Sequence, residues 1–387
     1  MRIAIITSGI LPVPAVKGGA VENLVEFYIN ENEKTGIHDI TVYSVRPDGN
    51  LPELPQKHTR FVFVNVHSFC GRLIRLLYSK LSKVYFYHPY VEFFLWRIKK
   101  DISRKKYDKI ILENRPAFAP ILRRLTKSRI ITHLHTDTIN PEETLAKEWL
   151  ENMDEVWPIS EYIKKRVLSV KNDIGTEVVM NGVNLSHFDS VSAIERGKIG
   201  FSTNDFVLVY FGRIIPEKGV EEVIQSMLKL MSCEHIKLLV IGSSFYDDTD
   251  RVDPFVEKIR TMSHPLKDRI LFTGYVPYSQ IPAYLKTCDV AILPSLCEEA
   301  FGLSMLEAMA CGVPVISTNA GGIPEVCGKS AFLFERNEAL VDNIVGAVKQ
   351  LQCNKNLYET IKESGLRQSR LFGSKRYAER MMSLLSK

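Results

Sequence analysis

The sequence predicts an α/β fold made of two doubly wound domains, and three observations support this. The chain has 387 residues, which is longer than one hydrophobic core commonly supports. Short apolar segments alternate with segments of helical spacing, a pattern typical of parallel sheets covered by helices on both faces. The turn dipeptide Asn181-Gly182 and the polar stretch 189–204 separate two such series. We therefore expect one domain over residues 1–188 and a second over residues 189–371.

Each domain is expected to contain several short parallel strands. In such folds ligands bind at the carboxyl ends of the strands, so we expect two Rossmann-like domains that face each other across a cleft, with the site in that cleft. The candidate strands of the first series lie at residues 2–8, 41–45, 61–66, 109–112, 129–134 and 155–159, with helical patterns such as 20–33 and 141–151 between them. Those of the second series lie at residues 206–211, 237–241, 270–273, 290–293, 313–318 and 331–334.

Composition is that of a soluble globular protein. No apolar run is long enough to span a bilayer, and residues 1–9 predict a strand because no charged leader or cleavage site accompanies them. The seven cysteines are odd in number and form no Cys-x-x-Cys pair. This usage indicates a reducing compartment and argues against structural zinc, so we expect a cytoplasmic protein.

The net charge of +5 is unevenly distributed. Residues 57–129 hold 18 basic and 4 acidic side chains, a local excess of 14 positive charges. Within this stretch, residues 70–85 have helical spacing, with basic side chains on one side and apolar side chains on another. Two interpretations stay open for residues 70–96: peripheral contact with an anionic membrane at the inner face of the cell membrane, or packing of the apolar side on the core.

Two carboxylates, Glu299 and Glu307, flank the expected start of a helix at residues 301–310. The first free backbone N–H groups of that helix, at Phe301, Gly302 and Leu303, favour a bound anion at the carboxyl end of the sheet. A carboxylate repels phosphate but accepts hydrogen bonds from hydroxyls. A ligand that carries both groups, such as a nucleotide sugar, fits this combination, and an ordinary turn with solvated acids is the alternative.

This segment, with its Pro-Ser, Phe-Gly, Glu-Ala-Met-Ala and Gly-x-Pro-Val-Ile strings, resembles the retaining glycosyltransferases of family four. That family has the GT-B fold, and its signature is two glutamates with seven residues between them. The resemblance implies that Glu307 holds the ribose hydroxyls and that Glu299 faces the transferred sugar. It also implies that the last helical segment, residues 372–387, returns to the first domain.

Two cations follow the first strand of the second series. The string Phe-Gly-Arg-Ile-Ile-Pro-Glu-Lys-Gly places Arg213 and Lys218 at a carboxyl edge. Fixed positive charges at this place suit a departing diphosphate, and the family uses the matching residues in this way. They make a metal unnecessary, so no metal and no cofactor are expected. A surface salt-bridge loop is the alternative.

The glycine pair Gly18-Gly19 precedes the helix expected from residue 20. Glycines at a helix start let backbone N–H groups approach phosphate and sugar closely, as in the family, while a plain turn is the alternative. The longer string Leu-Pro-Val-Pro-Ala-Val-Lys-Gly-Gly-Ala also resembles bacterial spore-coat and surface-polysaccharide members.

The string Thr-His-Leu-His-Thr-Asp ends a strand and contains His133 and His135. The resemblance implies that a histidine here contacts the sugar, and His135 fits better than His133. A structural histidine is the alternative, and Asp137 either assists or caps the next helix. Tyr275 and Val276 match the segment whose backbone reads the base in the family.

Three further features leave alternatives open. Glu325 meets the nucleotide or acceptor edge, or else caps a helix. The acidic string at residues 247–250 is either a metal site for the diphosphate or a polar loop. The family often has Gly-x-Gly-Pro where this chain has Gly-Ser-Ser-Phe at residues 242–245, which leaves the shape of the nucleotide pocket and the base preference open.

The resulting prediction is a retaining, metal-independent hexosyltransferase of the GT-B fold. It takes a hexose from a nucleotide diphosphate, most simply UDP, to a hydroxyl of a glycan or a lipid-linked glycan in the biosynthesis of cell-surface polysaccharides. No nucleic acid is expected among its partners. Two alternatives are a nucleotide-sugar 2-epimerase of the same fold and a non-catalytic coat or scaffold protein. Donor sugar, acceptor and linkage cannot be predicted from one sequence.

Overall fold

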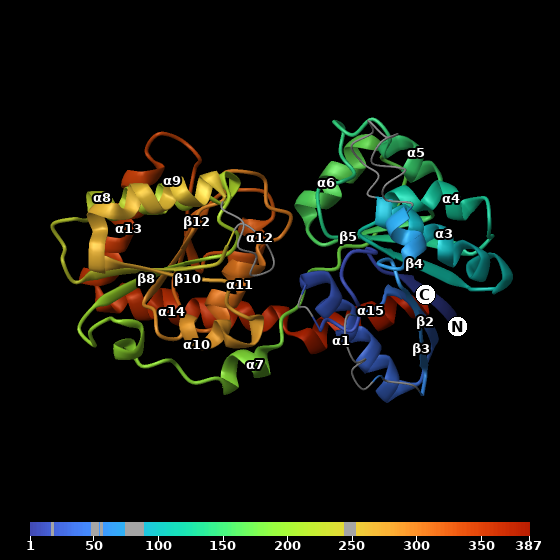
Figure 1. The fold of residues 1–387 in the computed structure, drawn as a ribbon, viewed down its shortest axis with the longest axis horizontal. Helices are drawn as coiled ribbons and strands as arrows, with labels where there is room; N and C mark the ends of the chain where they lie inside the picture. Colours follow the sequence, from blue (N-terminus) through green and yellow to red (C-terminus); the bar gives the residue numbers. More distant parts are fainter. Residues whose placement is uncertain (17–18, 48–53, 55–56, 74–88, 244–252) are drawn as a thin grey trace. The chain divides into compact units, whose positions relative to one another are not determined.

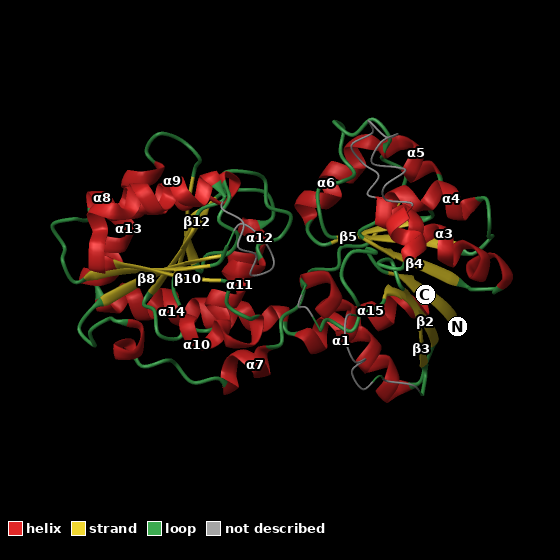
Figure 2. Ribbon diagram, in the orientation of Figure 1, coloured by secondary structure: helices red, strands yellow, loops and turns green. Residues whose placement is uncertain are grey.

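The chain folds as two compact α/β units in the computed structural model, which describes residues 1–16, 19–47, 54, 57–73, 89–243 and 253–387. Unit 1 consists of Met1–Gly182 and Ser374–Lys387, and unit 2 consists of Val183–Gly373. Figures 1 and 2 show one sheet in each unit with helices on its two faces. The prediction of two parallel-sheet domains is confirmed.

Unit 1 has a seven-stranded parallel sheet in the order β3-β2-β1-β4-β5-β6-β7. Its inner strands are almost entirely buried and apolar, as expected for strands covered on both faces. The short strand β7 was not predicted, because two residues carry no period. The strands are β1 (Arg2–Ile6), β2 (Asp39–Val45), β3 (Thr59–Val64), β4 (Lys109–Glu113), β5 (Arg129–Leu134), β6 (Glu155–Pro158) and β7 (Gly175–Thr176).

The last helix of the chain packs on unit 1. Helix α15 (Ser374–Ser386) lies beside α1 (Ala20–Thr35), and its buried side chains Tyr377 and Met381 share one core with Leu24 and Tyr28 of α1. The buried ammonium of Lys109 donates to the carbonyl oxygens of Leu384 and Leu385, at 3.1 and 2.9 Å. Further helices of unit 1 that the structure describes in full are α3 (Pro89–Arg104), α4 (Ala119–Arg123), α5 (Ala146–Glu151) and α6 (Glu161–Val170).

Unit 2 has a six-stranded parallel sheet in the order β10-β9-β8-β11-β12-β13. Its strands are β8 (Phe206–Phe211), β9 (Ile236–Ile241), β10 (Ile270–Gly274), β11 (Val290–Leu293), β12 (Val315–Thr318) and β13 (Ala331–Phe334). Its helices are α7 (Leu185–Ser190), α8 (Val220–Lys229), α9 (Pro254–Ser263), α10 (Ile281–Leu285), α11 (Leu303–Ala310), α12 (Ile323–Cys327), α13 (Leu340–Cys353) and α14 (Lys355–Ser369).

Both sheets have a point at which the strand order reverses. In unit 1 it lies between β1 and β4, and in unit 2 between β8 and β11. The loops that leave neighbouring strands at such a switch point turn to opposite faces of the sheet, and the crevice between them is where open α/β sheets bind ligands. The carboxyl ends of β1, β4, β8 and β11 are therefore the first places to search for function.

Two helices begin later than the sequence predicts. The segment expected to be helical from 141 is helical only from Ala146, because the side chain of Asn140 accepts from two backbone N–H groups and that of Glu143 from another, which builds turns instead. The helix expected from 301 begins at Leu303, since Gly302 has φ 106° and cannot be helical. Of the helix expected at 70–85, residues 70–73 are helical and the rest lies outside the described residues.

None of the helices within the described ranges combines the length and the apolar character that a membrane crossing needs.

Candidate functional site

The switch point of unit 2 brings two of the predicted site residues together. Lys218 ends a 3-10 turn (Pro216–Lys218) after β8, and Glu299 lies in the loop after β11. The ammonium of Lys218 forms an ion pair with the Glu299 carboxylate, and the side chains remain 27% and 22% exposed. Ser295, which follows β11, lies with its hydroxyl oxygen 3.3 Å from the same carboxylate oxygen. A cation and a carboxylate therefore meet where this fold binds ligands.

A cavity of about 50 Å³ lies beside this ion pair. Residues of β8, of β11 and its following loop, and of the first turn of α11 line it, so it belongs wholly to unit 2. The side chains that line it are mixed polar and apolar, as in sites that orient a ligand by a few polar contacts. They are Tyr210, Phe211, Lys218, Leu293, Pro294, Ser295, Glu299, Ser304 and Met305.

Glycines hold the Glu299 loop against its neighbour. Gly321 has φ 55°, and a Cβ there would lie 2.1 Å from the carbonyl oxygen of Glu299. The next residue, Gly322, donates its N–H to that oxygen at 2.7 Å. Because backbone atoms cannot move aside as a flexible side chain can, this close approach requires glycine. The Gly-Gly-Ile-Pro-Glu string thus positions Glu299, while Glu325 lies in the first turn of α12.

Glu307 lies in the middle of α11 and is half-buried. Burial raises the pKa of its carboxyl to about 7, and a hydrogen bond from Tyr278 opposes the rise. The ring of Tyr278 contacts Phe188 edge-on, with ring centroids 6.3 Å apart, which fixes the tyrosine beside the helix. Glu307 and Glu299 are thus both on unit 2, but each has its own hydrogen-bond partner.

The remaining predicted residues of unit 2 lie at its carboxyl edge or beside it. The Arg213 side chain is exposed directly after β8, and its carbonyl oxygen accepts from the Tyr210 hydroxyl at 2.6 Å. Tyr275 and Val276 occupy the loop after β10, where Tyr275 is 43% exposed. The Phe301 side chain is buried against Phe372, so only its backbone is offered to a ligand. Gly302 and Leu303 begin α11.

The switch point of unit 1 holds a buried polar cluster around Glu113, the last residue of β4. The Glu113 carboxylate accepts from the Tyr28 hydroxyl at 2.9 Å, and its other oxygen lies 3.1 Å from His133 Nδ1 and 2.9 Å from His135 Nε2. Glu113 and His133 are fully buried and the His135 side chain is 4% exposed. The three ligand atoms lie within 4.8 Å of one another, a spacing that a metal ion could share.

Burial, electrostatic attraction and hydrogen bonding together set the charge of this cluster. Burial opposes ionisation of Glu113, yet the two histidines hold the pKa of its carboxyl well below its usual range. Burial lowers the pKa of His135 to about 4, so that ring is neutral at pH 7. Its other nitrogen, Nδ1, is buried without a hydrogen-bond partner among the described residues. His135 is therefore held rigidly, and its predicted contact with a sugar stays a prediction.

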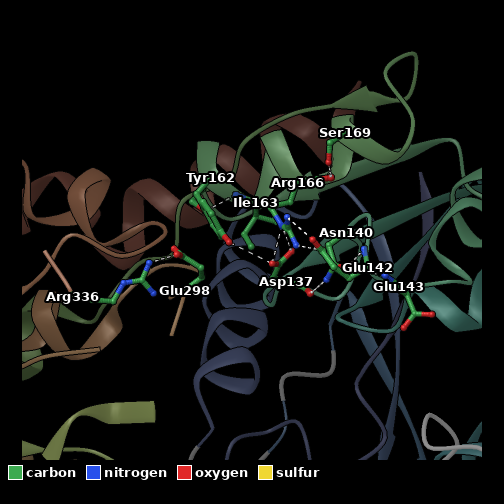
Figure 3. Close-up of polar contacts among 11 residues, drawn as sticks. Asp137, Asn140, Glu142, Glu143, Tyr162, Ile163, Arg166, Ser169, Glu298 and Arg336 are labelled. Carbon is green, nitrogen blue, oxygen red and sulfur yellow. Dashed lines mark hydrogen bonds and ion pairs between the residues drawn. The ribbon is translucent and has the colours of Figure 1, made fainter. Parts of the chain in front are cut away.

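The loop after β5 is fixed from both ends. Asn114, with φ 57°, accepts from the backbone N–H of His135 and from the Thr136 hydroxyl, both at 3.0 Å. Asp137 pairs with Arg166 of α6 at 3.0 Å and does not cap α5, whose N-cap is Leu145. Figure 3 shows Asp137 and Glu142 converging on Arg166, which ties this loop to α6.

Gly19 has a neighbour within its own unit. It has φ 110°, and a Cβ there would lie 2.2 Å from a carboxylate oxygen of Glu22, a buried residue of α1. Burial raises the pKa of Glu22, and the Ser8 hydroxyl lies 3.4 Å from its other oxygen. The need for glycine at 19 is thereby explained without a ligand. Gly18, the acidic string at 247–250 and most of the 242–245 loop lie outside the described residues.

Sequence reasoning missed Glu113, Ser295 and Tyr278. A charged residue at the end of an apolar strand was the available signal for Glu113, and the Pro-Ser string was the signal for Ser295. Nothing in the sequence distinguishes Tyr278 from any other tyrosine after a strand, because its partner Glu307 lies on a different element.

Comparison with known proteins agrees with this arrangement. Residues 191–368 match the family of glycosyl transferases, group 1. The putative glycosyltransferase YtcC of Bacillus subtilis is 28% identical over 344 residues, which are 84% of this chain and 77% of that protein. Spore coat protein SA of the same organism is 24% identical, with 100% of both chains covered.

Solved structures share the fold. A crystal structure of HepE from Anabaena in complex with UDP and glucose superposes with a TM-score of 0.73 at 18% identity, covering 100% of this chain and 99% of that one. Residues 191–368 are therefore similar to the group 1 glycosyl transferases, and the whole chain has the GT-B fold that the two-glutamate signature led us to expect.

Proposed function

We propose that this chain is a glycosyltransferase that transfers a hexose from a UDP-hexose to a hydroxyl of a glycan or lipid-linked glycan, with retention at the anomeric carbon and without a metal. The observation that carries the proposal is the meeting of Lys218 and Glu299 at the switch point of unit 2. A diphosphate needs the cation, and sugar hydroxyls need the carboxylate. The structure of the similar HepE with UDP and glucose supports the choice of UDP.

The proposed roles divide the donor among the residues of unit 2. Arg213 and Lys218 bind the diphosphate and stabilise the charge that grows on it as the bond to the anomeric carbon breaks. Glu307 accepts from the ribose hydroxyls, Glu299 accepts from the sugar hydroxyls, and the backbone at Val276 reads the base. The acceptor oxygen bonds to the anomeric carbon on the face that the diphosphate leaves, and its proton passes to the departing phosphate, which gives UDP.

The acceptor side is proposed to lie on unit 1, with His135 and the backbone at Gly18 and Gly19 near the transferred sugar. Contact with an anionic membrane is proposed for residues 70–96. Two exposed aromatic side chains support it: Phe69, directly before this stretch, is 81% exposed, and Trp96, its last residue, is 53% exposed. Cosedimentation with anionic liposomes tests this part, and a protein that stays wholly in solution contradicts it.

The decisive experiment is incubation with UDP-, GDP- and ADP-hexoses, with and without crude acceptor lipid, followed by mass spectrometry of products. Hexose transfer from a UDP-sugar is the expected result. Conversion of a UDP-sugar alone into another identifies an epimerase. The third outcome is no turnover with any of these donors. It favours a coat or scaffold role, an alternative that the full-length likeness to a spore coat protein makes specific.

The assignment of the diphosphate site is tested by Arg213→Ala and Lys218→Ala. Each is expected to lower turnover about 100- to 1000-fold, because it removes one fixed charge at the leaving group. Lys229→Ala is the matched control, since Lys229 pairs with Asp342 on the surface of the same unit. Turnover at the wild-type level in both site variants overturns the assignment.

A further inference from the structure

The ion pair between Lys218 and Glu299 joins two residues that the proposed function gives to different parts of the donor. Lys218 is assigned to the diphosphate and Glu299 to the sugar hydroxyls, yet in this structure the ammonium is bonded to the carboxylate. One ammonium cannot keep this carboxylate and also bind the diphosphate at full strength. A donor diphosphate and Glu299 would therefore compete for this ammonium.

The surroundings of the pair favour such an exchange. The two side chains are 27% and 22% exposed and line a cavity, so water and ligands reach them. Ion pairs that solvent reaches contribute little to stability, whereas a diphosphate offers an ammonium several charge-assisted hydrogen bonds. A ligand diphosphate is thus the stronger partner for Lys218.

Glu299 has a second side-chain partner that can remain when Lys218 leaves. The Ser295 hydroxyl oxygen lies 3.3 Å from the Glu299 carboxylate and 3.1 Å from the carbonyl oxygen of Cys297. One hydroxyl carries one proton, so Ser295 donates to one of these acceptors at a time. While Lys218 neutralises the Glu299 carboxylate, the Ser295 hydroxyl can donate equally well to the Cys297 carbonyl oxygen. When Lys218 leaves, the charged carboxylate becomes the better acceptor.

The backbone around Ser295 and Glu299 is already fixed. The backbone N–H of Ser295 donates to Thr318 Oγ1 at 2.9 Å, and the Thr318 hydroxyl donates to the Ser295 carbonyl oxygen at 2.7 Å. The Glu299 carbonyl accepts from Gly322 at 2.7 Å. Ser295 is 1% exposed, so the protein fixes its position closely. The exchange needs only a side-chain movement of Lys218 and a rotation of one hydroxyl.

We propose that Lys218 exchanges partners on donor binding, from Glu299 to the diphosphate, and that Ser295 is the positioning residue that then holds Glu299 toward the sugar. This inference rests on the proposed function. As a pair the two charges neutralise each other, and a diphosphate that binds Lys218 releases Glu299 as a hydroxyl acceptor when the sugar arrives. Glu299 thereby competes with the diphosphate for Lys218.

The competition is measured by UDP titration calorimetry, because UDP carries the diphosphate without the sugar that Glu299 would bind. Glu299→Gln is expected to bind UDP about two- to fivefold more tightly than the wild type, since the competing carboxylate is gone. The gain is expected to vanish when Lys218→Ala is added, because the two residues act through one contact. Glu298→Gln, which changes the same charge one residue away in a pair with Arg336, is expected to change nothing.

Three outcomes overturn the inference, and the third also overturns the proposed function. Equal or weaker UDP binding by Glu299→Gln removes the competition. A gain that persists with Lys218→Ala shows that Glu299 merely repels phosphate, so no partner is exchanged. A wild-type protein that binds no UDP removes the proposed function itself, and the inference with it, which distinguishes the two failures.

The role of Ser295 is tested by Ser295→Ala in the transfer assay. We expect kcat to fall about tenfold while the UDP dissociation constant is unchanged, because the hydroxyl acts on Glu299 only after Lys218 has moved. A thermal unfolding curve that matches the wild type shows that the variant is folded. Unchanged kcat, or a loss of UDP affinity equal to the loss of kcat, contradicts a positioning role.

Discussion

The two switch points of the molecule hold similar side chains in opposite states. In unit 1, Glu113 and His133 are fully buried and the Glu113 carboxylate has three donors within hydrogen-bond distance. In unit 2, Lys218 and Glu299 are about a quarter exposed and hold each other beside a cavity. A carboxylate whose partners are permanent contributes to stability, whereas one whose partner is exchangeable is available to a ligand. The two switch points thus differ in whether the carboxylate is sealed among its partners or accessible beside a cavity.

The comparison extends to protons. In unit 1 electrostatic attraction to His133 and hydrogen bonds from both histidines keep Glu113 ionised against burial, and burial lowers the pKa of His135 to about 4. In unit 2 burial raises the pKa of Glu307 to about 7. Lowering the pH therefore destabilises unit 1 through His135 and stabilises unit 2 through Glu307.

The largest expected effect is that of Glu113→Ala on the stability of unit 1. The substitution leaves Tyr28, His133 and His135 without their shared acceptor inside the protein, which costs about 4 kcal/mol in the free energy of unfolding. Hydrogen exchange resolved by peptide measures this separately for unit 1 and unit 2, as a protein of two units requires.

Glu177→Ala is the matched control, since Glu177 is a carboxylate of unit 1 that pairs with Arg380 and Lys387 at the surface. It is expected to cost less than about 1 kcal/mol. Equal protection of unit 1 in both variants contradicts the structural interpretation of the cluster. Binding of one metal ion per wild-type chain that is lost in Glu113→Ala also contradicts it.

Acidification should separate the two units without any mutation. The folded pKa of His135, about 4, lies below its ordinary value of 6.5, so its contribution is present above pH 6.5 and is lost as pH falls to 4. This loss amounts to about 3 kcal/mol in unit 1. Glu307 acts in the opposite direction, because its raised pKa stabilises the folded state of unit 2 below pH 7. Hydrogen exchange at pH 7.5 and pH 5 should show unit 1 losing protection relative to unit 2, and the reverse order contradicts the charge assignment.

Sequence patterns predicted the strands and the charged ends of the loops well, because burial on both faces gives each strand an apolar run. They predicted the partners poorly. The strand expected at 109–112 extends through Glu113 in the structure, where His133 and His135 lie within hydrogen-bond distance of the buried carboxylate. Lys218 and Glu299 were each assigned to a ligand, and only the fold shows that residues 81 positions apart bond to each other.

The substitution Gly321→Ala tests how rigidly the loop that carries Glu299 is held in unit 2. A Cβ at this position would lie 2.1 Å from the Glu299 carbonyl oxygen, and φ 55° is unfavourable for alanine. Both effects together are expected to cost about 2 to 3 kcal/mol of stability and to displace Glu299. Gly274→Ala is the control, because φ 71° carries the same backbone cost while nothing lies within 4 Å of its Cβ. Thermal unfolding and UDP-sugar turnover measure the two, and equal losses would show that the close approach to Glu299 is unimportant.

The smallest expected effect concerns the pH dependence of UDP binding through Glu307. Ribose hydroxyls donate to an ionised carboxylate, so binding requires deprotonation of a group whose pKa burial has raised to about 7. From pH 8 to pH 6 the wild type should lose about tenfold in UDP affinity through this group alone, since the proton competes with the ligand.

Glu307→Gln isolates that contribution, because the phosphate of UDP titrates equally with both proteins. The variant should bind UDP more weakly at pH 8 and show a pH dependence about tenfold smaller across the same range. Tyr278→Phe sharpens the test: without the hydrogen bond that opposes the rise, the pKa of Glu307 moves higher and the loss of affinity begins at a higher pH. Calorimetry at three pH values measures all three proteins. If wild type and Glu307→Gln lose affinity in parallel, Glu307 does not bind the ribose, and the raised pKa reflects only its place within α11.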